Sequence, residues 1–132
     1  ILNQRADQEI FSLAREKKMG VFVMAAVRTS LRNPEEAVET INQFIDDRLL
    51  SIPRPSEEDP LGLDKVTEGE IPSVTEAAYQ FAAAPEVVST VLIGTGNPEH
   101  LETNVADLLS SPLSETQRDY LKETYGHLAW NA

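Results

Sequence analysis

Residues 87–104 read VVSTVLIGTGNPEHLETN, an apolar run followed by a glycine turn and the start of a helix. The first seven residues are mostly aliphatic and β-branched, which predicts a parallel strand buried on both faces. Asn97 and Pro98 predict an N-cap followed by proline at the first helical position. Gly94 and Gly96 let a ligand approach the backbone, and a helix N-terminus carries a partial positive charge. The segment predicts either an anion site or an ordinary tight turn, and the glutamate in the first helical turn opposes the anion.

Helices alternate with apolar strands along the rest of the chain. Two strands linked through helices predict an α/β fold with about two parallel strands, a right-handed crossover and five helices. Because two strands leave sheet edges open, something else must cover them. Caps, prolines and glycines set the predicted limits of each element. In order, these elements are a helix with apolar Ile10, Leu13 and Ala14 that stops at Gly20, a strand over residues 21–27, helices from Asn33 and Ser73, the strand over 87–93, a helix from Asn97, and a helix from Ser114 to Gly126.

Residues 51–72 are predicted to form an exposed and mobile loop. They include Pro53, Pro55 and Pro60, which interrupt regular structure, and an acidic run over residues 57–59. A run of like charges of this kind usually forms a solvated surface. We therefore expect no functional role for these acidic residues.

Charge and cysteine content narrow the classes of partner. The 132 residues include 11 basic and 22 acidic side chains, a formal net charge of −11. Nucleic acids and anionic membranes bind surfaces rich in lysine and arginine, so neither is expected as a partner. The chain has no cysteine, which excludes disulfides, a thiol nucleophile and a cysteine zinc site, and its apolar runs are too short to span a membrane. We expect a cytoplasmic protein, with residues 1–132 as a single partial domain.

Two stretches resemble the aldo/keto reductases, NAD(P)H-dependent carbonyl reductases built on a (β/α)8 barrel. IGTGNPEHLETNV, residues 93–105, closely resembles the last strand and helix of that family, and AREKKMGVFVMA, residues 14–25, resembles the helix and strand preceding its seventh strand. The resemblance extends over most of the chain. A complete barrel needs about 250 residues, and the first residue is Ile1 rather than Met. The resemblance therefore implies the C-terminal portion of a TIM barrel and not a complete one.

The resemblance implies a set of cofactor-binding residues for NADP(H) or NAD(H). His100 stands where many members place an arginine against the adenosine 2′-phosphate, and a neutral imidazole is a weaker phosphate ligand than a guanidinium. Asn104 matches the asparagine that contacts adenine. Many members have lysine at position 95, so the threonine here leaves the choice between NADP and NAD open. The loop that wraps the adenosine phosphates corresponds to Gly94, Thr95, Gly96 and Asn97.

The loop after the first predicted strand departs from the family pattern. Met24 replaces the tyrosine that stacks on nicotinamide in many members, and Arg28 and Ser30 replace small glycines. Arg28 is a candidate donor to the pyrophosphate, and a solvent-facing loop arginine is the alternative. In one alignment register, Asn3 and Gln4 match the family's residue pair whose glutamine holds the nicotinamide carboxamide. In several subfamilies that glutamine lies a few residues further upstream, and in that register it would fall before Ile1.

No catalytic residue is assigned in this chain. The family's proton-donating tyrosine and its lysine, aspartate and histidine partners come from the first half of the barrel, which this sequence does not include. Packing or surface roles are expected for the remaining candidates, and no metal site is expected. These candidates are Tyr79, Tyr120, Tyr125 and His127.

Three functions follow from these observations. The favoured one is the C-terminal, cofactor-binding part of an NAD(P)H-dependent aldo/keto reductase, whose full-length form transfers hydride from nicotinamide to an aldehyde or ketone. The second is a non-catalytic module of the same ancestry that binds another protein through its uncovered apolar faces. The third, a flavodoxin-like phosphate-binding domain, needs more strands than the sequence contains. A measurement of cofactor binding distinguishes the first function from the second.

Overall fold

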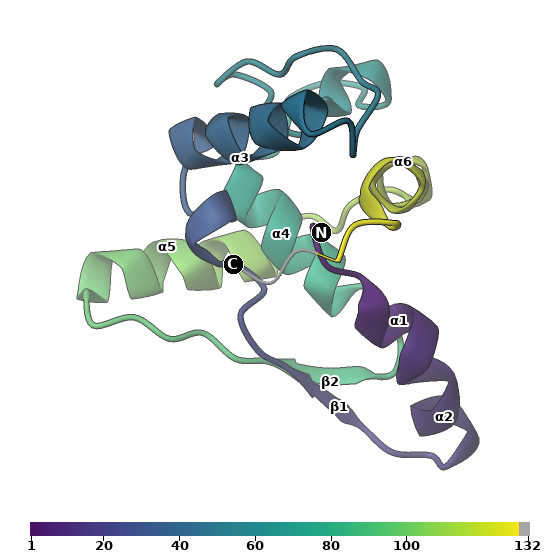
Figure 1. Ribbon diagram of the computed structural model, residues 1–132. Coiled ribbons are helices and arrows are strands. Elements are labelled where there is room, and N and C mark those ends of the chain that lie inside the picture. The colour runs from purple at the N-terminus through teal and green to yellow at the C-terminus, as the bar shows by residue number, and fades with distance from the viewer. Residues whose placement is uncertain (130–132) are drawn as a thin grey trace.

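The computed structural model describes residues 1–129, which form six α-helices, two short 3₁₀ helices and one two-stranded parallel sheet (Figure 1). The sheet lies along one edge of the molecule, and α3, α4 and α6 form a helical body beside it. The α/β fold class is confirmed, and the sheet is not closed into a barrel. The elements are α1 (Arg5–Glu9), α2 (Phe11–Glu16), β1 (Val21–Val23), η1 (Thr29–Leu31), α3 (Pro34–Asp46), η2 (Leu63–Lys65), α4 (Val74–Ala83), β2 (Val88–Val91), α5 (Pro98–Leu109) and α6 (Glu115–Tyr125).

The predicted starts of the capped helices are confirmed. Ser73 and Glu76 form a capping box at the start of α4, in which the serine hydroxyl accepts from the Glu76 amide at 3.1 Å. Ser114 and Gln117 form the same arrangement at the start of α6. At α3, the Asn33 side chain accepts from the backbone amide three residues later. Each cap pairs an amide that has no partner inside its helix, so the local sequence sets these boundaries.

The core lies between α3, α4, α6 and part of the segment predicted to be an exposed loop. Ile41 of α3 and Leu121 of α6 are fully buried there. Leu61 and Leu63 are buried in the same cluster, so the prediction of exposure is wrong at these two residues. The Asp59 carboxylate accepts from the Leu63 amide at 2.8 Å and turns the chain inward. A side-chain cap thus replaces regular backbone pairing, and the two leucines reach the core.

The sheet is shorter and more exposed than predicted. β1 and β2 pair in parallel, with Val23 opposite Val91 and a register shift after Val21. Leu92, in the run of residues 87–93 that was predicted to be buried on both faces, is 44% exposed, so that prediction is wrong. Phe22 and Met24, in the other predicted strand, are 67% and 74% exposed. The physical reason is that burial of a parallel strand requires layers on both faces, and within residues 1–129 the sheet has only two strands.

The first predicted helix is divided in two at Ile10. Phe11 and Ala14 pack against Val87, whereas the predicted apolar residues Ile10 and Leu13 are exposed. The helix was predicted to stop at Gly20, whereas α2 ends at Glu16 and Lys18 has the left-handed φ of 53° that is typical of a residue just after a helix. Gly20 has a different role, because a Cβ there would lie 2.2 Å from the Ser89 hydroxyl oxygen.

Candidate functional site

The glycine turn connects β2 to α5 and is exposed throughout, from Gly94 to His100. The Asn97 amide donates to Thr95 Oγ1 at 3.1 Å, and the Asn97 side chain accepts from the Glu99 amide at 3.0 Å. Pro98 has no amide hydrogen to pair. These short-range bonds hold the turn in shape and direct the N-terminal end of α5 toward solvent.

Neither glycine of the turn is required by the chain itself. A Cβ added at Gly94 or Gly96 would meet no atom within 4 Å, and neither residue has a φ in the left-handed region. Gly62 shows the opposite case, with a φ of 71° and a Cβ position 2.6 Å from the Tyr120 hydroxyl. Space on the Cβ side of the turn is therefore open, as close approach of a ligand to the backbone requires.

Helix α5 is attached to the molecule through its C-terminal end. The buried Gln80 side chain on α4 donates to the backbone carbonyls of Asp107 and Leu108, both at 2.8 Å. Thr75 Oγ1 also donates to the Asp107 carboxylate at 2.7 Å. In Figure 1, the long segment after β2 runs outward to the far end of α5, and the chain then returns toward α4 through this helix. The end of the helix that carries the candidate anion site projects away from α4.

His100 and Asn104 lie on one face of α5, because residues four apart on a helix are neighbours. His100 is exposed and Asn104 is half-buried. Thr103 between them donates its hydroxyl to the Glu99 carbonyl at 3.0 Å. The sequence-predicted residues from Gly94 to Asn104 thus form one continuous unit of turn and helix. The Asn97 and Glu99 amides are already paired within this unit, so the donors it could offer an anion are its other backbone amides and one imidazole, and the unit contains no acid–base dyad.

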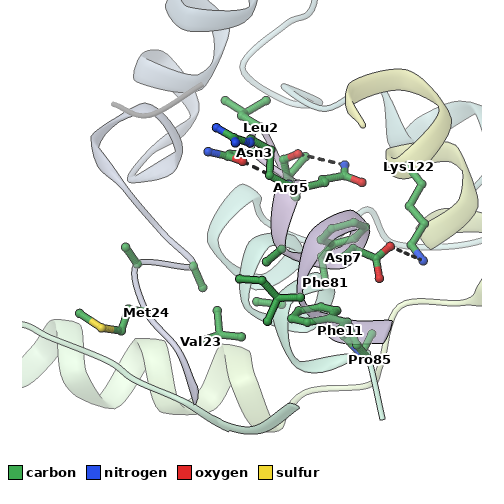
Figure 2. A pocket seen from close by; sticks show the side chains of 18 of the residues that line it. Leu2, Asn3, Arg5, Asp7, Phe11, Val23, Met24, Phe81, Pro85 and Lys122 are labelled. Atoms are coloured by element: carbon green, nitrogen blue, oxygen red, sulfur yellow. Dashed lines mark hydrogen bonds and ion pairs between the residues drawn. The ribbon is translucent and has the colours of Figure 1, made fainter. Parts of the chain in front are cut away.

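Arg28 lies elsewhere, in the lining of a cavity of about 530 Å³ (Figure 2). The cavity opens between α1, α2, the segment after β1, the end of α4 and α6, and residues 92–104 do not line it. The segments that follow β1 and β2 leave the same edge of the sheet and then diverge, the first toward α3 and the second toward the far end of α5 (Figure 1). Arg28 therefore lines a cavity that none of the other six predicted site residues line.

The cavity lining also includes Asn3 and Gln4, for which two registers were open. Met24 and Ser30, where the sequence departs from the family pattern, line it as well. The buried Gln4 amide nitrogen donates to the carbonyls of Ile1 and Leu121, at 3.0 and 3.1 Å. Both of its hydrogens are therefore already bonded within the protein. Sequence reasoning missed this cavity, because its walls come from five elements far apart in the chain and no local pattern marks it.

The tyrosines with raised pKa values serve packing. Tyr125 is fully buried and donates its hydroxyl to the Leu61 carbonyl at 3.0 Å, and burial raises its pKa well above the ordinary value. Burial and the nearby Asp107 charge also raise the pKa of Tyr79. Within residues 1–129 no group of histidine and acidic side chains is arranged to hold a metal ion, and no helix is long and apolar enough to cross a membrane.

Comparison with known proteins relates this geometry to a fold. No protein-family model matches the sequence, and no curated protein matches it. Two solved structures match, the holo and apo forms of aldo-keto reductase AKR11C1 from Bacillus halodurans, each with a TM-score of 0.57, at 20% and 19% sequence identity. Each match covers 92% of this chain but only 38% and 39% of the reductase. In fold, this chain therefore resembles part of the barrel of that reductase, and it spans less than half of the reductase's length.

Proposed function

We propose that this chain is the C-terminal, cofactor-binding part of an NAD(P)H-dependent aldo/keto reductase. The observation that carries the proposal is the open glycine turn at the N-terminus of α5, in a chain whose fold matches part of such an enzyme. The substrate of the longer protein would be a small aldehyde or ketone, and its compartment the cytoplasm. Nicotinamide would supply the hydride, and this chain's own residues would hold the cofactor.

The binding of the adenosine phosphates rests on the turn and the first turn of α5. Amides at a helix N-terminus and the helix dipole favour an anion there, by about 0.3–1 kcal/mol for each exposed charge. Glu99 offsets part of this gain, and position 95 carries a threonine rather than a lysine. We therefore expect weak binding by the chain alone and no preset preference for NADP over NAD.

A valine at Gly96 tests the proposal directly. The side chain has open space in this chain, so the fold is expected to persist, while the β-branched group blocks approach of a phosphate to the backbone. NADPH titrated into the wild-type chain should shift the amide NMR signals of residues 94–104, and Gly96→Val should abolish these shifts. Ser111→Val, at an exposed residue outside the turn, serves as the matched control. Shifts that persist in Gly96→Val would overturn the assignment.

The role of His100 has its own test. In the longer protein, His100→Arg replaces a titrating imidazole by a permanent, bidentate cation. The ratio of NADPH to NADH affinity should rise by about tenfold, which corresponds to one charge-assisted hydrogen bond of roughly 1.4 kcal/mol. An unchanged ratio would show that His100 does not face the 2′-phosphate.

A second candidate function is a partner-binding module without catalysis. Exposed apolar side chains on β1 and α5 favour it, including Phe22, Leu101 and Leu109. The two candidates differ in one measurement. A chain that binds no nicotinamide cofactor even when joined to the rest of a barrel would support the module and contradict the reductase.

A further inference from the structure

Helix α5 carries the proposed cofactor turn at one end and is attached to the rest of the molecule near the other. Residues 94–103 are all exposed, and no side chain of α5 is fully buried. The half-buried residues of the helix are Asn104, Asp107 and Leu108, all in its C-terminal half. In Figure 1 this half lies beside α4, whereas the N-terminal end projects outward. The direction of α5, and with it the position of the turn, therefore depends on contacts near Asp107.

The C-terminal end of α5 has no cationic side chain of its own. Its last turn contains no basic residue, and it carries Asp107, whose negative charge is unfavourable at the carbonyl end of a helix. The last carbonyls of a helix also have no partners inside it. Hydrogen-bond donors from another element would therefore stabilise this end.

Two side chains of α4 supply such donors. The Gln80 side-chain nitrogen lies 2.8 Å from the carbonyl oxygens of Asp107 and Leu108. It lies 3.2 Å from the carbonyl oxygen of Ser110. Thr75 Oγ1 donates to the Asp107 carboxylate at 2.7 Å, so the acid has a donor as well. Gln80 is only 5% exposed, and a buried amide with bonded hydrogens specifies one arrangement of the helices that it joins.

The length of α5 amplifies any change at this contact. A helix rises about 1.5 Å per residue, so the 12 residues of α5 place the turn roughly 18 Å from its C-terminal end. A rotation of about 10° around that end would move the turn by roughly 3 Å. Hydrogen bonds to a phosphate would not survive this displacement, because they require donor–acceptor distances of about 2.7–3.2 Å.

We propose that Gln80, assisted by Thr75, is a positioning residue for the cofactor turn, because it fixes the direction of α5. The inference rests on the proposed cofactor role of the turn. Neither side chain is expected to touch the cofactor, since both lie at the opposite end of the helix. The hydrogen bonds within the turn set its shape but not its place in the molecule. The α4 contact sets that place.

The direction of α5 can be measured without a cofactor. The chain has no cysteine, so Glu39→Cys on α3 and Glu102→Cys on α5 introduce one pair of spin labels at exposed positions. Pulsed electron paramagnetic resonance then gives the distances between the labels. Gln80→Met keeps the length of the side chain and removes its donors. It should shift or broaden the distances by roughly 2 Å, which a rotation of about 10° would produce at residue 102. Unchanged distances would overturn the proposal.

Cofactor affinity shows whether this direction matters for binding. In the NADPH titration followed by the amide signals of residues 94–104, Gln80→Met should weaken binding about tenfold, the effect of losing one charge-assisted hydrogen bond. Thr75→Val should also weaken it, whereas Thr75→Ser keeps the hydroxyl and should retain the wild-type affinity. Shifted label distances with an unchanged affinity would overturn the positioning role.

A second buried glutamine provides the matched control. Gln117 of α6 is 8% exposed and donates to Thr67 Oγ1 at 2.9 Å, away from α5. Gln117→Met removes a buried amide in the same way and should leave the label distances and the NADPH affinity unchanged. A role of Gln80 in stability alone would give both glutamine variants the same loss of affinity, and this result would contradict the inference.

The proposed function and this inference fail separately. If Gly96→Val abolishes NADPH binding and Gln80→Met leaves it unchanged, the turn binds the cofactor and only the positioning role is overturned. A wild-type chain that binds no NADPH would contradict the proposed function. The label distances, measured without cofactor, decide on their own whether Gln80 fixes the direction of α5.

Discussion

The helical body and the sheet of this chain bury apolar side chains to different extents. In the body, Leu121 is fully buried between α3, α4 and α6, while on β1 and α5 the side chains of Phe22 and Leu109 are 67% and 78% exposed. The difference teaches that the helices find their partners within residues 1–129. A parallel sheet needs cover on both faces, whereas within these residues β1 and β2 pair with each other and pack against α2 and α4.

The largest expected effect compares one leucine from each region. Leu121→Ala removes a fully buried side chain and should lower the free energy of unfolding by about 3 kcal/mol. Leu109→Ala makes the same chemical change on an exposed helix position and should change it by less than about 0.5 kcal/mol. Urea unfolding followed by circular dichroism measures both. Similar values for the two variants would refute the division into a packed body and an open sheet region.

Alkaline pH should weaken the helical body through Tyr125. Burial raises the pKa of this tyrosine in the folded state, so the unfolded chain loses its proton first as pH rises past about 10. The free energy of unfolding should therefore fall above about pH 10, and Tyr125 should contribute at most about 1.4 kcal/mol per pH unit to this slope. Tyr125→Phe should reduce this slope, leaving the part that comes from Tyr79. An unchanged slope would exclude Tyr125 as its source.

Gln80 joins the two regions and should have an intermediate effect. Gln80→Ala leaves the carbonyls at the C-terminal end of α5 without their side-chain donor, which should cost about 1–2 kcal/mol. Hydrogen exchange should accelerate in α5 more than in α3. Thr75→Val, which removes the bond to the Asp107 carboxylate at the same contact, is the comparison variant. Uniform acceleration in both helices would mean that α5 is not a separately attached unit.

The smallest expected effect on stability concerns the open face of β1. Phe22→Ser exposes no new apolar surface and should change the free energy of unfolding by less than about 0.5 kcal/mol. Its effect should appear instead in self-association, because it removes an exposed aromatic ring from the sheet. Sedimentation velocity at increasing concentration measures this. A large loss of stability would show that Phe22 is packed in solution and that the contrast between the regions is overstated.

Several elements were predictable because their signals are local. The caps at Asn33, Ser73, Asn97 and Ser114 pair amides within three residues, so the sequence near each helix start is sufficient. The turn at Gly94 was predictable for the same reason. The division of the first helix at Ile10 was not, because Phe11 and Ala14 pack against Val87, more than seventy residues away.

The candidate site residues show the same contrast between local signals and contacts of distant segments. The six residues from Gly94 to Asn104 lie together because they follow one another through a turn and one helix, and the sequence alone placed them. Arg28 was grouped with them by resemblance, and it lines a cavity that the other six do not line, which no local pattern in the sequence indicated. Their roles in cofactor binding stay predictions until the titrations are made.

The sequence by itself determined the order of helices and strands, the capped helix starts and the exposed glycine turn, because each depends on hydrogen bonds and backbone preferences within a few residues. Only the tertiary structure decided that Leu61 and Leu63 are buried, that Phe22 is exposed, and that five cationic side chains from distant segments line one cavity. Burial and charge clustering depend on which distant segments meet, and that is settled by how the whole chain packs.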